Sequence, residues 1–226
     1  MEKSVRLMFV CAAALCLAGA AFATPISGVY SSGITVAVGE QDPYWQIYYD
    51  AQPMAAYVVE DSGWPGSWAA NDANSRWIGP QINYSGLTSA FDPIGDYGFA
   101  LRFDLTGYNK ATADIRFRWS SDNVGSHVFL NGVDLVGVPT IGSQGYGAMS
   151  AEFALPGIYL ESGMNLLEFK VTNVACPECG DRPNPAAVRV EFTSADAAQV
   201  VPEPSVALLT GIGLIGLGVL FRRRRA

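Results

Sequence analysis

A strict alternation of apolar and polar residues most constrains the fold of this 226-residue chain. In the segment 97–108, apolar residues occupy every second position from Phe99 to Leu105, and Arg102 and Asp104 lie between them. Successive side chains of a β-strand point to opposite faces, so a period of two predicts a strand with one buried face and one exposed face.

The alternation recurs through the rest of the chain. Further strands are expected in the segments 111–123, 126–135, 165–173 and 186–194, and less regular ones at 33–39, 44–50 and 55–61. Asn131-Gly132 is a strong two-residue hairpin signal. No convincing run at helical spacing lies between residues 24 and 200. We therefore expect an all-β fold in which two antiparallel sheets pack face to face as a β-sandwich.

The first 23 residues predict a signal peptide. Lys3 and Arg6 precede an apolar stretch, and small alanines occupy the positions that a signal peptidase reads before Thr24. We expect signal peptidase to cut before Thr24, which places the remainder of the chain outside the cytoplasm.

The last residues predict one transmembrane helix. The uncharged segment 206–221 would rise about 24 Å as a helix, slightly less than a bilayer core. Proline cannot lie inside a helix, so the helix begins after Pro204, and basic residues beyond its end stay on the cytoplasmic side.

The C-terminal segment 199–226 resembles the PEP-CTERM sorting signal of Gram-negative bacteria. The residues that carry the resemblance are the motif Val201, Pro202, Glu203 and Pro204, the apolar helix 206–221, and the basic stop Arg222, Arg223, Arg224 and Arg225. The resemblance implies an exosortase, a membrane-embedded transpeptidase, as a partner. It further implies a transient stay in the inner membrane, followed by release to the cell surface or to an exopolysaccharide matrix or biofilm.

Charge excludes one class of partner. The segment between residue 24 and the prolines holds 19 acidic and 8 basic side chains. A surface of this sign repels phosphate backbones, so nucleic acid is not expected as a partner.

Two cysteines remain after signal removal. Cys176 and Cys179 lie in a proline-rich stretch, where we expect a small local disulfide. A redox pair or a metal site are the alternatives; a zinc site needs two more ligands, and the chain has one histidine.

The region 24–198 forms the predicted sandwich domain, and its later part resembles galactose-binding-like jelly rolls, the fold of many carbohydrate-binding modules. The resemblance covers roughly residues 60–195 and is carried by the order of the segments WAANDANSRWIG, FALRFDLTGY, ATADIRFRWSSDNVGSHVFLNG, GMNLLEFKVTN and AAVRVEF.

Aromatic residues in the irregular segment 62–84 are candidates for a glycan platform. Trp64, Trp68, Trp77 and Tyr84 lie among glycine, proline and asparagine residues. Indole and phenol rings stack on sugar rings, while neighbouring amide and carboxyl groups bind hydroxyls. The alternative is that these rings pack in the core or against loops.

Oxygen-bearing side chains raise the question of a structural calcium ion. Asp61, Asp72 and Asn74, or Asp122 and Asn123, offer the oxygen ligands that calcium prefers, and the resembled fold often holds such an ion. Hydrogen bonds from these side chains to turn backbones explain the same residues without a metal. No other cofactor is expected.

Catalysis is not expected. His127 is the single histidine, its neighbour Ser126 would point to the opposite face of a strand, and no Gly-x-Ser-x-Gly elbow exists. The sequence therefore favours a secreted, non-enzymatic surface or matrix protein associated with polysaccharide. A carbohydrate-binding module that uses loop tryptophans is the alternative, and an envelope glycoside hydrolase with paired carboxylates is a remote one.

Overall fold

The computed structural model describes residues 23–61, 68–82, 92–175, 184–200 and 213. Contacts divide the chain into one unit formed by Ala23–Ala198 and another formed by Met1–Phe22 with Gln199–Ala226. Within the described part of the chain, no helix is long and apolar enough to cross a bilayer. The predicted signal peptide lies outside the described residues except for Ala23, and the predicted membrane helix lies outside them except for Gly213.

The unit Ala23–Ala198, hereafter the β-body, is built from strands and short 3-10 turns. The strands are β1 (Ala23–Pro25), β2 (Gln41–Tyr49), β3 (Gln52–Val58), β4 (Ile78–Gly79), β5 (Gly95–Asp104), β6 (Asp114–Asp122), β7 (Val124–Leu130), β8 (Val133–Asp134), β9 (Phe153–Ala154), β10 (Met164–Asn173) and β11 (Ala187–Ala198). The turns are η1 (Lys110–Thr112), η2 (Gly145–Gly147) and η3 (Gly157–Tyr159). The prediction of an all-β fold is confirmed.

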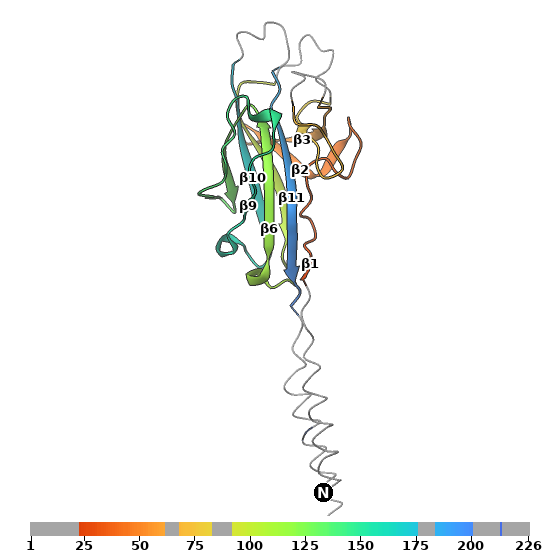
Figure 1. Cartoon of the computed structure of the whole chain (residues 1–226), viewed down its shortest axis with the longest axis vertical. Helices are drawn as coiled ribbons and strands as arrows, with labels where there is room; N and C mark the ends of the chain where they lie inside the picture. The colour runs from red at the N-terminus through yellow and green to blue at the C-terminus, as the bar shows by residue number, and fades with distance from the viewer. Residues whose placement is uncertain (1–22, 62–67, 83–91, 176–183, 201–212, 214–226) are drawn as a thin grey trace, which may run out of the picture. The chain divides into compact units, whose positions relative to one another are not determined.

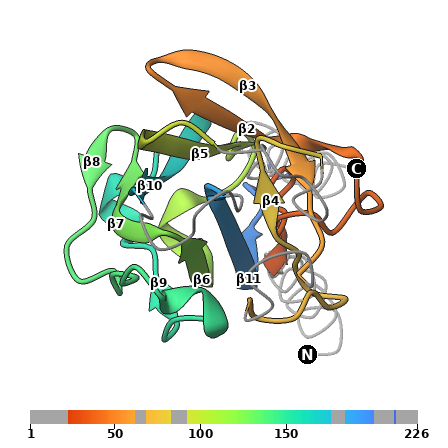
Figure 2. The same cartoon turned by 90° about the horizontal axis from the view of Figure 1, so that it is seen from above.

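All strand pairs are antiparallel, in the order β8-β7-β10-β5-β2-β3-β4-β11-β6-β9, with β1 on β11. The strands fold into two layers with the core between them (Figures 1 and 2). Across that core, the ring of Phe169 in β10 lies 5.2 Å from Phe117 and 5.3 Å from Trp119, both in β6. These ring contacts pack β10 against β6 across the core.

The alternation expected from the sequence orients the long strands. Every apolar side chain expected to face inward on β5, β6, β7 and β10 is buried, whereas Arg102 and Arg116 between them are exposed. The fully or nearly fully buried members of this set are Phe99, Leu101, Phe103, Leu105, Ile115, Phe117, Trp119, Val128, Leu130, Leu167, Phe169 and Val171. Their burial supplies the main stabilising free energy of the fold.

The hairpin signal is also confirmed. Asn131 and Gly132 connect β7 to β8, and both have left-handed backbones, with φ of 52° and 80°. A two-residue turn with positive φ at both positions matches the right-handed twist of the strands it joins, which explains the choice of Asn-Gly.

The strand expected at residues 33–39 is wrong. Gly33 and Gly39 have φ of +68° and +87°, and Ile34 and Val38 are each 41% exposed. The two left-handed glycines turn the chain at both ends of the segment, so Ile34 and Val38 face solvent and only Val36 packs against the core.

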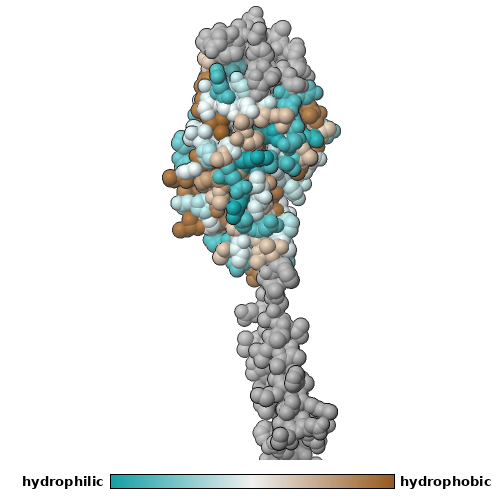
Figure 3. Space-filling model, viewed as in Figure 1, coloured by the Kyte–Doolittle hydropathy of each residue, from teal (hydrophilic) through white to brown (hydrophobic). Residues whose placement is uncertain are grey.

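The outer face of the layer formed by β6 and β11 is polar. Figure 3 shows a hydrophilic stripe over these strands. Arg118 in β6 pairs with Glu191 in β11 at 3.0 Å, and Arg116 pairs with Asp114 at 2.8 Å. The charges of this face therefore neutralise one another across and along the strands.

Candidate functional site

A bulge in β2 creates the larger of the two described cavities. Four residues of β2, 42–45, lie opposite the single residue Ala56 of β3. Extra residues in one strand disrupt the ladder locally and bend the strand, and such bulges recur beside binding sites. The result is a cavity of about 560 Å³, hereafter the bulge cavity, lined by β2, β3 and β5 with Tyr44, Gln46, Tyr48, Met54, Ala100 and Arg102 among its residues.

Asp42 holds the bulge in shape. Its Oδ1 accepts hydrogen bonds from the backbone amides of Tyr44 at 2.9 Å and Trp45 at 3.2 Å, and its Oδ2 accepts one from Gly33 at 2.8 Å. The Asp42 side chain is buried. The bonds to Tyr44 and Trp45 hold the backbone of the bulge, and the bond to Gly33 ties the preceding loop to it, so the carboxylate stabilises a shape that strand pairing alone would not.

Two tyrosine rings and an amide line the cavity. Tyr44 is 40% exposed, and its ring centroid lies 4.1 Å from that of Tyr30. The hydroxyl of Tyr48 donates a hydrogen bond to Oε1 of Gln46 at 2.9 Å. A supported aromatic ring beside amide and hydroxyl groups provides both a stacking surface and hydrogen-bonding partners.

Trp68 and Trp77 do not form the predicted glycan platform. Trp77 is fully buried and Trp68 is 7% exposed; their ring centroids lie 4.6 Å apart in a small core cluster with Val59 and Ala187. Burial between loop and sheet leaves no ring face for a sugar, so the alternative of core packing holds for both. Trp64 and Tyr84 lie outside the described residues.

Trp68 anchors its loop to a buried carboxyl group. Its indole Nε1 donates to Oδ2 of Asp122 at 2.8 Å, and Nδ2 of Asn123 donates to Oδ1 at 2.5 Å. Burial raises the pKa of Asp122 to about 7, the charge of Asp92 adds to that rise, and the two hydrogen bonds oppose it. Asp122 and Asn123, expected as candidate calcium ligands, therefore bind protein donors in this structure.

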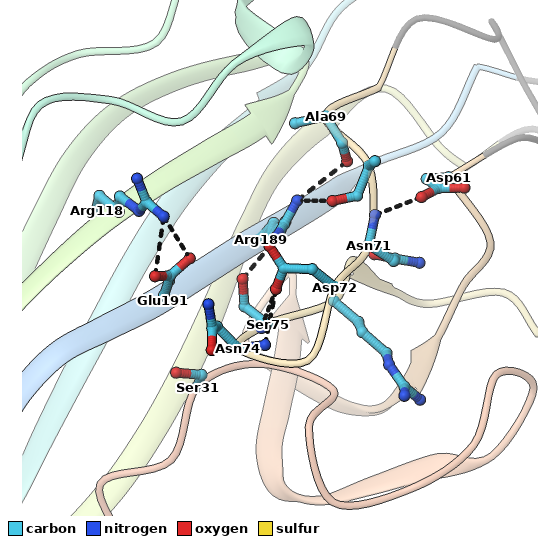
Figure 4. Close-up of polar contacts among 12 residues, drawn as sticks. Ser31, Asp61, Ala69, Asn71, Asp72, Asn74, Ser75, Arg118, Arg189 and Glu191 are labelled. Atoms are coloured by element: carbon cyan, nitrogen blue, oxygen red, sulfur yellow. Dashed lines mark hydrogen bonds and ion pairs between the residues drawn. The ribbon is translucent and has the colours of Figure 1, made fainter.

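Arg189 is the centre of a cluster of buried polar contacts between β11 and the loop around residues 69–75, shown in Figure 4. This guanidinium of β11 is 2% exposed and donates to the carbonyls of Ala69 and Ala70 and, at 2.8 Å, to the hydroxyl of Ser75. It also pairs with Oδ2 of Asp72 at 2.8 Å. The oxygen atoms of the loop thus converge on an arginine.

Asp61 and Asp72, two of the expected calcium ligands, already accept hydrogen bonds from protein donors. Burial alone would raise the pKa of Asp72, but hydrogen bonds from the amides of Asn74 and Ser75 and from Arg189 outweigh it and lower the pKa. Asp61 accepts a hydrogen bond from the amide of Asn71. Among the described residues, no group of three or more histidine, cysteine, aspartate or glutamate side chains is arranged to hold a metal ion. The calcium expectation stays a prediction.

His127 lies at the surface. Its ring is 54% exposed, and Nδ1 lies 2.8 Å from Oδ2 of Asp134, beside a smaller cavity of about 200 Å³. The predicted sorting motif 201–204, the arginines 222–225, and Cys176 with Cys179 lie outside the described residues.

Sequence reasoning missed the bulge cavity. One signal was present: in QDPYWQIYY the buried positions Asp42, Trp45 and Ile47 are spaced by three and then two, which breaks the period of a regular strand. Such a break marks extra residues in the strand, and the aspartate beside it marks a local side-chain-to-backbone turn.

Comparisons with known proteins assign no family. No protein family model matches the chain, and no match is found among curated proteins.

Proposed function

We propose that the chain is an exported, non-enzymatic surface or matrix protein whose β-body binds extracellular polysaccharide. In this proposal the signal peptide directs export, and the C-terminal segment holds the protein at the inner membrane until an exosortase cuts it near Pro202, Glu203 and Pro204. The β-body is proposed to be a galactose-binding-like jelly roll, in line with its all-β antiparallel architecture.

The bulge cavity is the observation that carries the binding role. It combines the exposed ring of Tyr44, supported by the ring of Tyr30, with the amide of Gln46 and the hydroxyl of Tyr48 on the same strand. Its volume of about 560 Å³ lies within the range of roughly 300–1,000 Å³ typical of small-molecule sites. It therefore replaces the tryptophan loop as the proposed glycan site.

Binding of the full chain, purified in mild detergent, to a glycan array tests this proposal. Tyr44→Ala removes the stacking surface and is expected to weaken glycan binding roughly two- to ten-fold, since an aromatic contact is worth roughly 0.5–1.5 kcal/mol beyond the area it buries. Tyr159→Ala is the matched control, because Tyr159 is 39% exposed but does not line the cavity. Equal binding by the wild-type and Tyr44→Ala proteins, or no binding to any glycan, would contradict the proposal.

A further inference from the structure

The pairing of basic side chains in the β-body is nearly complete. The structure describes seven lysine and arginine side chains there, and six of them donate to an acceptor. These six, each with one acceptor, are Arg76 with Val36 O, Lys110 with Leu160 O, Arg116 with Asp114, Arg118 with Glu191, Lys170 with Glu168, and Arg189 with Asp72. An acidic protein offers each cationic side chain many acceptors, so all seven lysine and arginine side chains are expected to have one.

Arg102 is the exception. It lies on the outer face of β5, is exposed, and lines the bulge cavity. No described residue accepts a hydrogen bond from its guanidinium or forms an ion pair with it. The unpaired cation and the exposed Tyr44 ring thus line the same cavity.

The carboxylates closest to this region along the strands have other partners. Asp42 binds three backbone amides, and Asp104, two residues after Arg102, binds the amide and hydroxyl of Thr106. Glu168, on the neighbouring strand β10, pairs with Lys170 at 2.9 Å. The guanidinium of Arg102 is therefore left for an anionic group from outside the β-body.

We propose that the bulge cavity binds a glycan that carries carboxylate groups, a polyuronate, with Arg102 bound to a uronate carboxylate and Tyr44 against the sugar ring. This inference rests on the proposed glycan-binding function and names its substrate class. A guanidinium presents two parallel N–H groups whose spacing matches the two oxygens of a carboxylate, which gives geometric specificity as well as attraction.

The negative charge of the β-body does not prevent this contact at physiological salt. Exposed charges farther apart than about 8 Å are largely screened at 0.15 M ionic strength, whereas a direct arginine–carboxylate pair is within hydrogen-bonding distance. The bond with Arg102 is therefore expected to dominate over repulsion from distant carboxylates.

The test measures binding of the full chain, in mild detergent at 0.15 M salt, to oligogalacturonate and to its methyl-esterified form. Esterification removes the carboxylate charge and keeps the sugar ring. Because hydrogen bonds to charged groups are stronger than those between neutral groups, both esterification and Arg102→Gln are expected to weaken binding about ten-fold or more. Arg102→Lys keeps the charge without the paired N–H groups of a guanidinium, so its affinity is expected to lie between those of the wild type and Arg102→Gln. Arg116→Gln, an exposed arginine on the opposite layer, is the matched control.

Several outcomes would overturn the inference, and they separate it from the proposed function. If Arg102→Gln or esterification leaves binding unchanged while Tyr44→Ala abolishes it, the cavity binds neutral glycan and only the polyuronate assignment fails. Equal, Arg102-dependent binding of dextran sulfate would show a general anion site. Binding that a chelator abolishes in the wild-type protein and in Arg102→Gln alike would show calcium bridging. No binding to either sugar or to any arrayed glycan would refute both proposals.

Discussion

At the scale of single residues, buried polar side chains hold the loops of the β-body to its strands. Arg189 gathers the carbonyls of Ala69 and Ala70, and the Trp68 indole binds the carboxyl group of Asp122. Each of these groups is costly to bury alone and is stabilised by its partner. Trp68 and Trp77 therefore serve the fold, which is why these two rings do not form the glycan platform expected from the sequence.

Asp122 gives the β-body a measurable pH dependence. Its pKa in the folded protein is raised to about 7, from an ordinary value of 3.8, so the folded state holds a proton that the unfolded state releases. The contribution of Asp122 to the unfolding free energy is therefore complete below pH 3.8. It decreases as the pH rises from 3.8 to about 7, and it is lost above about pH 7. A shift of about three pKa units corresponds to about 4 kcal/mol.

Asp122→Asn tests this dependence. The variant cannot ionise at this position, so its unfolding free energy is expected to decrease less between pH 4 and pH 7 than that of the wild type, as measured by urea denaturation. Asp96→Asn, at an exposed aspartate that accepts a hydrogen bond from Thr172, is the control and keeps the wild-type slope. Identical slopes for Asp122→Asn and the wild type would contradict the assignment.

At the scale of elements, β2 decides where the bulge cavity forms. Its second half pairs regularly with both neighbours, Tyr48 with Pro53 in β3 and with Gly98 in β5. Its first half loses the regular register with β3 at the bulge. There the carboxylate of Asp42 accepts hydrogen bonds from the amides of Gly33, Tyr44 and Trp45. The cavity thus depends on the irregular first half of β2, which lies between β3 and β5.

Asp42→Ala tests the role of this carboxylate. Three buried or partly buried amides lose their acceptor, so the unfolding free energy is expected to decrease by at least about 3 kcal/mol, measured by chemical denaturation. Asp104→Ala is the control: Asp104 also accepts a hydrogen bond from the amide two residues on, but this bond is exposed, so a much smaller loss than for Asp42→Ala is expected. Equal losses in the two variants would show that Asp42 does not hold the bulge.

The long strands were predictable because burial on one face imposes a period of two. Phe99 to Leu105 and Ile115 to Trp119 carry that period, and the core between the layers enforces it. The segment 33–39 carries the same period without a strand, because glycines at its ends take left-handed conformations that a hydropathy pattern does not reveal. The bulge cavity needs the register of β2 against β3, which is a property of pairing between strands and not of either sequence alone.

At the scale of the whole molecule, the two ends of the β-body meet. Ala23 pairs with Ala198, so the residue before the predicted signal cleavage site lies opposite the last residue of β11. Cleavage before Thr24 would leave Thr24 and Pro25 of β1 paired with β11. Both proposed processing steps, at Thr24 and near Pro202, therefore fall at the ends of the β-body in sequence.

Intact mass spectrometry of the protein recovered from each fraction of a producing Gram-negative cell that has an exosortase tests this account most directly. The account predicts a surface or extracellular form that begins at Thr24 and lacks residues 206–226, and an uncut membrane form that accumulates when Pro202 and Pro204 are both replaced by alanine. Val200→Ala, just before the motif, is expected to be processed normally. Recovery of the soluble full-length chain from the cytosol, with Met1 and Arg222 to Arg225 still present, would contradict it.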